Sequence, residues 1–244
     1  MDARRRLIVG NWKMNVLRAD AVALAGELVE RVRAEPPVCE LLVCPPATAI
    51  EAVARVLVDS GISIGGQDCH TAERGPYTGE ISAEMLRDLD CSHVIIGHSE
   101  RRQDFGETDA LARAKVKAAW RAGLTAVLCV GETRSEHRAG RALASVLAEV
   151  AAGVPEGTSP HKLVVAYEPI WAIGTDIAPA TSDIAHIHAA IRHRLPTGTR
   201  ILYGGSVNPK NAAEILTISD VDGCLIGRAS LKAKDFWAIA MNCR

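Results

Sequence analysis

The run Ala126-Val127-Leu128-Cys129-Val130 is followed by a helical pattern over Ser135–Ala152 and then by a second run, Leu163-Val164-Val165-Ala166-Tyr167. Neither run alternates between polar and apolar residues, so we expect strands that are buried on both faces. Two such strands joined by a helix form a βαβ unit, in which the strands are parallel. This stretch therefore predicts an α/β fold with a parallel sheet.

The same unit repeats along the chain. Eight runs rich in Val, Ile and Leu are expected to be strands: Leu7–Val9, Leu41–Cys44, Ile62–Gly65, Val94–Gly97, Ala126–Val130, Leu163–Tyr167, Ile201–Tyr203 and Cys224–Ile226. Eight strand–helix units without a linker favour a (β/α)8 TIM barrel that forms one domain over residues 1–244. An open parallel sheet is the alternative that this pattern leaves.

Amphipathic patterns lie between the runs. The first covers Ala19–Arg33, and Thr48 and Glu51 have the spacing of a capping box at the start of the next helix. Asn208-Pro209 combines a cap residue with a proline suited to a first helical position, so it predicts another helix start. Further helices are expected over Thr108–Ala122, Ser135–Ala152, Ser182–Leu195 and Leu231–Met241.

The composition excludes several classes of protein. The 244 residues include 28 Lys+Arg and 29 Asp+Glu, a net charge of −1 that argues against nucleic acid as a partner. No apolar stretch is long enough to span a membrane, and the first residues lack the apolar region of a secretion signal. The seven cysteines form no C-x-x-C pair, which is typical of reduced thiols in a cytoplasmic protein.

Residues whose side chains could take part in catalysis follow several of the expected strands. Asn11 and Lys13 come after the first, His98 and Glu100 after the fourth, and Glu168 after the sixth. Each alone has an ordinary explanation as a solvated charge, a structural histidine or a salt-bridge residue. Because the carboxyl ends of the strands meet at one rim of a barrel, we expect these side chains to converge on a single site.

Two glycine-rich turns complete this rim. Gly204-Gly205-Ser206 follows the seventh strand and Gly227-Arg228 follows the eighth, and such turns offer backbone N–H groups to a phosphate. A carboxylate can remove a proton from carbon, while an imidazole and an ammonium stabilise the oxygen that gains charge. The set predicts proton abstraction beside the carbonyl of a small phosphorylated sugar.

Motifs for other chemistries are missing or incomplete. The sequence contains no phosphate-binding loop of nucleoside triphosphatases and no dinucleotide-binding G-x-G-x-x-G. Gly97-His98-Ser99-Glu100-Arg101 is similar to a nucleophile elbow but lacks its second glycine. His186 and His188 are two residues apart on an expected helix, on different faces, which suits a shared metal poorly. We therefore predict a reaction without a cofactor or a metal.

Six segments of the chain, in family order, resemble the triosephosphate isomerase family. They are Gly10-Asn11-Trp12-Lys13-Met14-Asn15, Tyr77-Thr78-Gly79-Glu80-Ile81-Ser82, Gly97-His98-Ser99-Glu100-Arg101-Arg102, Cys129-Val130-Gly131-Glu132-Thr133, Ala166–Thr175 and Tyr203-Gly204-Gly205-Ser206-Val207-Asn208. The resemblance implies a glycolytic and gluconeogenic enzyme that interconverts D-glyceraldehyde 3-phosphate and dihydroxyacetone phosphate through an enediol(ate).

The resemblance also implies a role for each residue of the first half of the site. Glu168 matches the base, and His98 matches a neutral imidazole that polarises the carbonyl, an account for which this family is the standard example. Lys13 matches the electrostatic group beside the substrate, with Asn11 near it and Glu100 close behind.

The phosphate end of the site is implied in the same way. Pro169–Thr175 matches a lid whose Gly174 amide closes on the phosphate, and Ser206, Gly227 and Arg228 would supply the other amides. Cys129 matches a buried cysteine near the base, for which simple packing is an equally good explanation. Family members are commonly homodimers, and Thr78 would lie at the tip of a loop, Gly75–Glu80, inserted beside the partner's active site.

The chain departs from the family pattern near the phosphate. Arg228 replaces a second glycine, Pro76 replaces an alanine in the dimer loop, and Asp176-Ile177-Ala178-Pro179 changes the end of the lid. These changes leave open a related isomerase of four-carbon ketose phosphates, namely L-erythrulose 1-phosphate or D-erythrulose 4-phosphate. A non-catalytic sugar-phosphate binding protein is the remaining alternative, and it would be expected to lack Glu168, His98 or Lys13.

Overall fold

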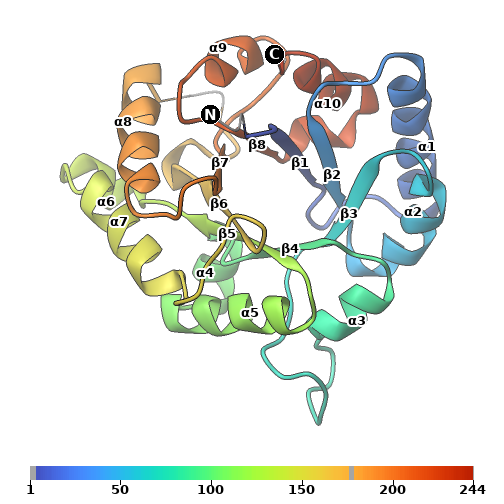
Figure 1. The fold of residues 1–244 in the computed structure, drawn as a ribbon, viewed down its shortest axis with the longest axis horizontal. Helices are drawn as coiled ribbons and strands as arrows, with labels where there is room; N and C mark the ends of the chain where they lie inside the picture. Colours follow the sequence, from blue (N-terminus) through green and yellow to red (C-terminus); the bar gives the residue numbers. More distant parts are fainter. Residues whose placement is uncertain (1–3, 176–178, 244) are drawn as a thin grey trace.

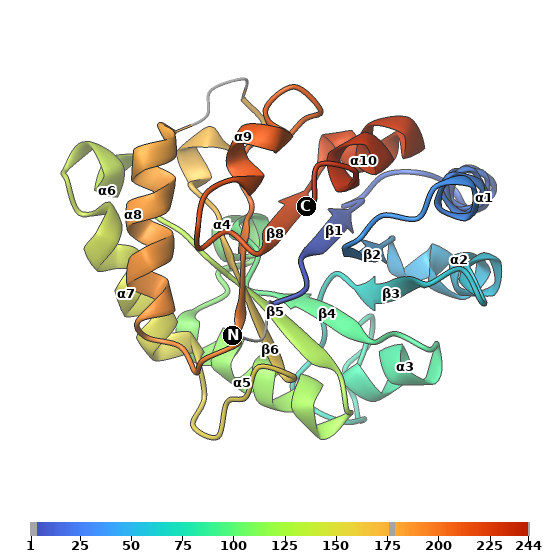
Figure 2. The ribbon, with the colours of Figure 1, turned by 45° about the horizontal axis from the view of Figure 1, so that its top comes forward.

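The fold is a closed barrel of parallel strands, as a computed structural model that describes residues 4–175 and 179–243 shows (Figures 1 and 2). The strands are β1 (Leu7–Asn11), β2 (Glu40–Cys44), β3 (Ile62–Gly66), β4 (His93–Ile96), β5 (Thr125–Val130), β6 (Leu163–Tyr167), β7 (Arg200–Tyr203) and β8 (Gly223–Ile226). They pair in chain order, and β8 pairs with β1. The (β/α)8 barrel is thus confirmed, and the open sheet is excluded.

Strand boundaries differ from the expected ones at the rim. β1 continues to Asn11, so this residue belongs to a strand rather than to the loop that follows it. Gly97 was expected to end the fourth strand, but β4 ends at Ile96 because Gly97 has a φ of +69°, outside the β region. This turn redirects the chain toward His98.

In every strand except β3, alternate residues pack into two separate apolar clusters, and β3 contributes only to the larger one. The cluster inside the barrel consists of Leu7, Val9, Leu42, Cys44, Ile95, Val127, Cys129, Val164, Ala166, Leu202 and Leu225. The intervening residues, such as Ile8 and Leu41, pack outward against the helices in a larger cluster. Both faces of the strands are therefore buried, which explains the lack of alternation in the sequence.

Helices surround the barrel (Figure 1). They are α1 (Arg18–Ala34), α2 (Ile50–Leu57), α3 (Ala83–Asp88), α4 (Ser99–Phe105), α5 (Asp109–Arg121), α6 (Arg134–Arg138), α7 (Ala142–Gly153), α8 (Thr181–Arg192), α9 (Ala212–Leu216) and α10 (Ala233–Ala240), with 3-10 turns at Ala47–Ala49, Ile170–Ala172 and Arg228–Leu231. Across the described ranges, none is long and apolar enough to cross a bilayer.

Two helix predictions are wrong in their details. The expected capping box at Thr48 does not form, because Thr48 lies inside a 3-10 turn and α2 begins after Ala49 without a side-chain cap. The single helix expected over Ser135–Ala152 is divided into α6 and α7, because Gly140 between them has a φ of +68°.

The third correction concerns Asn208-Pro209, where a helix was expected to begin. α9 begins only at Ala212. The Asn208 side chain instead accepts a hydrogen bond from the N–H of Lys210 at 2.9 Å, and the Asn211 amide donates to the carbonyl of Ser206 at 2.9 Å. The segment is thus a turn that holds the loop after β7.

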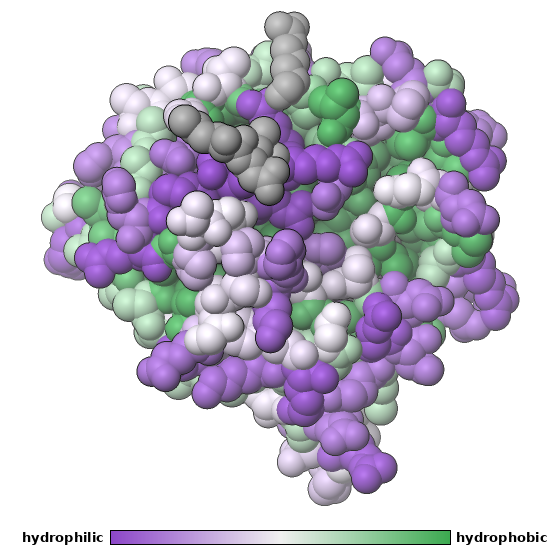
Figure 3. Space-filling view, in the orientation of Figure 1, coloured by the Kyte–Doolittle hydropathy of each residue, from purple (hydrophilic) through white to green (hydrophobic). Residues whose placement is uncertain are grey.

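Two surface features lie outside the barrel's rim. Figure 1 shows the segment between β3 and α3 extending away from the rest of the molecule, and this segment contains Thr78 and the half-exposed Tyr77. In the same orientation, Figure 3 shows hydrophilic side chains gathered in the upper centre of the view.

Candidate active site

One pocket, with a volume of about 440 Å³, lies among the carboxyl ends of β1, β4, β6, β7 and β8. Its lining includes Asn11, Lys13, His98, Glu168, Gly174, Ser206, Gly227 and Arg228, which are the residues predicted to bind substrate or do chemistry. Glu100 contacts this set from outside the lining, and Thr78 lies in the extended segment. A pocket of this size accommodates a small phosphorylated sugar.

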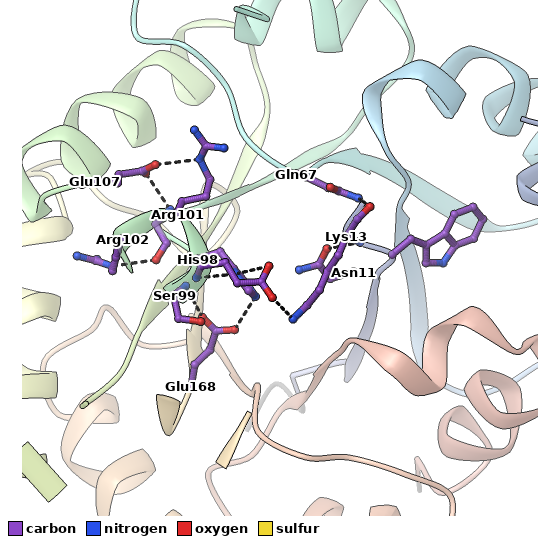
Figure 4. Close-up of polar contacts among 12 residues, drawn as sticks. Asn11, Lys13, Gln67, His98, Ser99, Arg101, Arg102, Glu107 and Glu168 are labelled. Carbon is purple, nitrogen blue, oxygen red and sulfur yellow. Dashed lines mark hydrogen bonds and ion pairs between the residues drawn. The ribbon is translucent and has the colours of Figure 1, made fainter. Parts of the chain in front are cut away.

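The backbone at Lys13 has an unusual conformation. Its φ is +52°, a left-handed value that is rare for a residue with a side chain. The side-chain oxygen of Asn11 accepts from the Lys13 N–H at 3.1 Å, and the amide of Gln67 donates to the Lys13 carbonyl at 2.9 Å. Both backbone polar groups of Lys13 are therefore held, which directs the side chain into the pocket (Figure 4).

The Lys13 ammonium forms an ion pair with Glu100. Its Nζ atom is 2.6 Å from Oε1 of Glu100, and the carboxylate is half-exposed. Exposed ion pairs add little stability because water screens them. The consequence is positional: the contact holds a long, flexible side chain at the mouth of the pocket beside His98 (Figure 4).

His98 is buried, and both of its ring nitrogens have partners. The backbone N–H of Glu100 donates to Nδ1 at 3.3 Å, while Nε2 is 3.1 Å from Oε1 of Glu168. Because an N–H group faces Nδ1, a neutral ring carries its proton on Nε2, pointing at the carboxylate.

The contact between His98 and Glu168 shifts the pKa values of both groups. Burial opposes the charged form of each group, but the mutual attraction outweighs it, so the pKa of His98 is raised and that of Glu168 is lowered. The N–H of Ser99 also donates to Oε2 of Glu168 at 3.2 Å and favours the carboxylate. Glu168 is therefore ionised at neutral pH although it is only 2% exposed.

Two glycines allow Glu168 to occupy its position. A Cβ added to Gly131 would lie 1.7 Å from the backbone oxygen of Glu168, and one added to Gly204 would lie 2.8 Å from its Cγ. Both distances are shorter than atoms tolerate without movement. Gly131 and Gly204 are thus required by the close approach of β5, β6 and β7 around the carboxylate.

Cys129 lies next to the same carboxylate but belongs to the cluster inside the barrel. Burial, together with the negative charge of Glu168, raises the pKa of the Cys129 thiol well above its ordinary value. The thiol therefore stays protonated beside the carboxylate, within the packed cluster inside the barrel.

The four predicted phosphate-binding residues share one property. Among the described residues, the backbone N–H groups of Gly174, Ser206, Gly227 and Arg228 have no protein acceptor. N–H groups that lack a protein acceptor and line one pocket can donate together to an anion. The distribution of donors supports a phosphate at this part of the pocket.

Arg228 makes a contact that the sequence did not predict. Its Nη2 atom donates to the carbonyl of Gly174 at 3.3 Å, so the guanidinium connects the loop after β8 to the segment predicted to be a lid. Gly174 has a φ of +70° and is exposed. Of the altered lid end, Asp176, Ile177 and Ala178 lie outside the described residues, whereas Pro179 is buried.

Two residues that support the site were not predicted. Gln67 holds the Lys13 carbonyl, and Glu107 accepts from the N–H of Gly97 at 3.2 Å while pairing with the buried ammonium of Lys115 at 2.9 Å. Gln67 directly follows β3, so its position at a strand end was the available signal. Glu107 lies between helices α4 and α5 and had no such signal.

Comparisons with known proteins agree with this geometry. The family model described as triosephosphate isomerase matches residues 6–243. The chain is 54% identical to the triosephosphate isomerase of Afipia carboxidovorans over 98% of both chains, and 54% identical to that of Xanthobacter flavus over 97% of both. It is also similar to the crystal structure of triosephosphate isomerase from Bartonella henselae, with a TM-score of 0.89, 42% identity, and coverage of 96% of this chain and 97% of that one. The chain therefore belongs to the triosephosphate isomerase family.

Proposed function

We propose that this enzyme interconverts D-glyceraldehyde 3-phosphate and dihydroxyacetone phosphate through an enediol(ate), with Glu168 as the base. The observation that carries the proposal is one pocket that combines a buried, ionised carboxylate with four backbone N–H groups for which the described residues offer no acceptor. The carboxylate suits proton abstraction from carbon, and the N–H groups suit a phosphate. A short phosphorylated carbonyl compound is the substrate class that uses both.

The proposed reaction needs three side chains. Glu168 removes a proton from the carbon next to the carbonyl and returns it to the neighbouring carbon, so the carboxylate is regenerated. The Nε2–H of His98 donates to the oxygen that gains negative charge and mediates proton exchange between the two oxygens. The ammonium of Lys13 stabilises the same charge. Because product and substrate are isomers, no oxidant or reductant is consumed.

The substrate would replace one contact seen in this structure. The Glu168 carboxylate accepts from the Nε2–H of His98, with 3.1 Å between Nε2 and Oε1. A substrate carbonyl needs the same donor. We infer that substrate binding separates the pair. Separation removes the attraction that raises the pKa of His98, and it frees the carboxylate for the carbon-bound proton.

Phosphate recognition rests on backbone groups and one added charge. The N–H groups of Gly174, Ser206, Gly227 and Arg228 are proposed donors, and closing of the lid at Gly174 would exclude water from the intermediate. The Arg228 guanidinium already contacts the Gly174 carbonyl. It is positioned to add a charge-assisted contact to the phosphate that a second glycine at this position would lack.

The substrate assignment is tested by kcat/KM of the wild-type enzyme. We expect kcat/KM for D-glyceraldehyde 3-phosphate to be at least about 100-fold higher than for L-erythrulose 1-phosphate or D-erythrulose 4-phosphate. This ratio corresponds to roughly 2.7 kcal/mol of discrimination between transition states. A larger value for either four-carbon substrate would replace the proposal with the related isomerase. Binding of all three without turnover would indicate a sugar-phosphate binding protein.

We also propose a homodimer in which the Gly75–Glu80 segment lies beside the partner's active site, with Thr78 at its tip. Large apolar side chains near this segment and after β1 support the proposal, because Met14 is 96% exposed, Met85 52% and Tyr77 45%. Light scattering should give twice the chain mass of 26.0 kDa. An active species of single-chain mass would refute the arrangement.

Three remaining expectations concern the chain as a whole. We propose that residues 1–244 form one domain, that the enzyme works in the cytoplasm, and that it serves gluconeogenesis as well as the glycolysis implied by its family. Seven free, buried cysteines support a reducing compartment. A single cooperative unfolding transition followed by two spectroscopic probes would support one domain, and two separated transitions would contradict it.

A further inference from the structure

Two cysteines that the reaction does not use lie together at the end of the barrel where the strands begin. Cys39 immediately precedes β2, and Cys243 follows α10 near the end of the chain. Both thiols are buried and free. Although 204 positions separate them in sequence, the closed barrel brings the C-terminal segment back to the start of β2.

Their atoms converge on one carbonyl. The Cys39 thiol donates to the backbone oxygen of Ala240 at 3.7 Å, and the backbone N–H of Cys243 donates to the same oxygen at 3.0 Å. The Cys243 thiol is also close enough to raise the pKa of the Cys39 thiol. Two cysteines that bond to one carbonyl oxygen lie close together, as a disulfide requires.

One of the two cysteines lines a surface cavity. A cavity of about 430 Å³ is lined by Cys243 and by three consecutive arginines, Arg4, Arg5 and Arg6. Arg4 pairs with Asp222 at 2.8 Å, whereas Arg5 and Arg6 donate to the backbone carbonyls of Val38 and Leu216. Arg5 and Arg6 thus bring positive charge without a carboxylate partner among the described residues.

The local charge affects which reagents enter. Guanidinium groups attract anionic reagents into the cavity. The nearby Cys243 thiol, together with burial, raises the pKa of Cys39. Cys39 is therefore the poorer first nucleophile, and Cys243, which lines the cavity, is the thiol that an entering reagent meets.

We propose that Cys39 and Cys243 form a reversible intramolecular disulfide by exchange with an anionic low-molecular-weight disulfide. The Cys243 thiolate attacks one sulfur of the reagent, whose S–S bond breaks to release one thiol and leave a mixed disulfide on Cys243. The Cys39 thiolate then attacks the Cys243 sulfur and releases the second thiol. Two electrons pass from the protein to the reagent, and the two thiol protons end on the two released thiols.

The cross-link would stabilise the fold without touching the active site. It would join the start of β2 to the segment after α10 and so restrict the unfolded chain over almost its whole length. The catalytic residues follow the opposite ends of the strands, so their geometry is expected to remain unchanged. The oxidised enzyme should therefore show unchanged kcat/KM and a Tm higher by about 5 °C or more.

The test uses the native full-length chain and glutathione disulfide. After incubation, free thiols are blocked with N-ethylmaleimide, and the protein is analysed by intact mass and peptide mapping. We expect a loss of two hydrogen atoms, a cross-linked pair of peptides containing Cys39 and Cys243, and alkylation of the other cysteines only after unfolding. Two free thiols at these positions, or a mixed disulfide on Cys243 that never resolves, would overturn the proposal.

Single variants separate the two steps. Cys39→Ser keeps a donor for the Ala240 carbonyl and should stop the reaction at the mixed disulfide on Cys243, whereas Cys243→Ser should abolish both products. Cys69→Ser is the matched control, because Cys69 is also buried with its thiol near a backbone carbonyl, and it should leave the cross-link unchanged. Cross-linking that persists in Cys39→Ser would refute the assignment, and none of these outcomes depends on the proposed isomerase activity.

Discussion

Nε2 of His98 lies 3.1 Å from Oε1 of Glu168, on the opposite side of a ring whose Nδ1 accepts from the Glu100 N–H at 3.3 Å. The two contacts assign opposite roles to the two nitrogens: Nδ1 accepts and Nε2 donates. An imidazole held in this way presents its proton to whatever lies beside Glu168. The geometry therefore supports a neutral electrophile next to a carboxylate base, as proposed for the reaction.

The first prediction concerns the ammonium of Lys13. Lys13→Met preserves side-chain length and removes the charge, so we expect kcat/KM to fall by about 100-fold or more while Tm changes little. Steady-state kinetics and thermal unfolding provide the two measurements. Glu100→Gln is the comparison, because it removes the charged partner 2.6 Å from the Lys13 ammonium and leaves the ammonium in place. The fall in kcat/KM should be smaller for this variant than for Lys13→Met. Wild-type kinetics in Lys13→Met would show that the charge is not used.

The second prediction concerns the space around Glu168. Gly131→Ala places a Cβ 1.7 Å from the Glu168 carbonyl, so the strand ends must separate. We expect a loss of about 2 kcal/mol of stability and a decrease in kcat/KM of at least about 10-fold. Gly26→Ala in α1 is the control, because nothing lies within 4 Å of the added Cβ, and it should stabilise the fold by about 0.5–1 kcal/mol. Equal effects of the two substitutions would refute the steric argument.

The third prediction concerns pH and Glu149, whose carboxylate accepts from the Gly131 N–H at 2.8 Å. Burial raises the pKa of Glu149 from 4.5 to about 7. Between pH 4.5 and about pH 7, the folded chain keeps a proton on Glu149 that the unfolded chain has lost. The free energy of unfolding therefore falls as pH rises, by at most about 1.4 kcal/mol for each pH unit. Glu149→Gln should remove this contribution. Urea unfolding at pH 5 and pH 8 measures it, and an identical pH dependence in both proteins would contradict the shift.

The fourth prediction concerns Arg228. Arg228→Gly removes the guanidinium that contacts Gly174, and we expect KM to rise by about 5-fold with little change in kcat, an effect of roughly 1 kcal/mol. The salt dependence of KM should also decrease. Arg228→Met removes the charge but keeps most of the side-chain volume. Its KM should rise as much as that of Arg228→Gly if the charge is what matters. An unchanged KM in both variants, with unchanged relative kcat/KM for three- and four-carbon substrates, would remove Arg228 from substrate binding.

The main parts of the fold and the site were predictable because their signals are local. Each buried strand carries its apolar run, and a polar residue at its end, such as Glu168 or His98, lies at the rim by the geometry of the barrel. The supports of these residues were not predictable, because they come from distant parts of the chain. Gly131 makes room for Glu168, and Glu107 holds the N–H of Gly97 beside His98, without any local pattern that announces the contact.

Helix starts show where local patterns fail. Thr48 and Glu51 have the same spacing as Thr133 and Glu136, yet only the second pair forms a capping box. Thr133 has extended backbone before α6, whereas Thr48 is already part of a 3-10 turn, so its side chain has no helix start to cap. The motif is necessary for the box, and the path of the preceding chain decides whether it forms.

The Glu168 carboxylate is proposed to move a carbon-bound proton, and hydrogen exchange measures that transfer itself. Dihydroxyacetone phosphate is incubated in D2O with the wild-type enzyme or with Glu168→Gln, and deuterium at the carbon next to the carbonyl is followed by NMR. Glu168→Gln keeps the size of the side chain, and its Tm serves as the check on folding. We predict rapid exchange with the wild type and exchange slower by about 1,000-fold or more with a folded Glu168→Gln. Exchange by the variant at the wild-type rate would contradict the account.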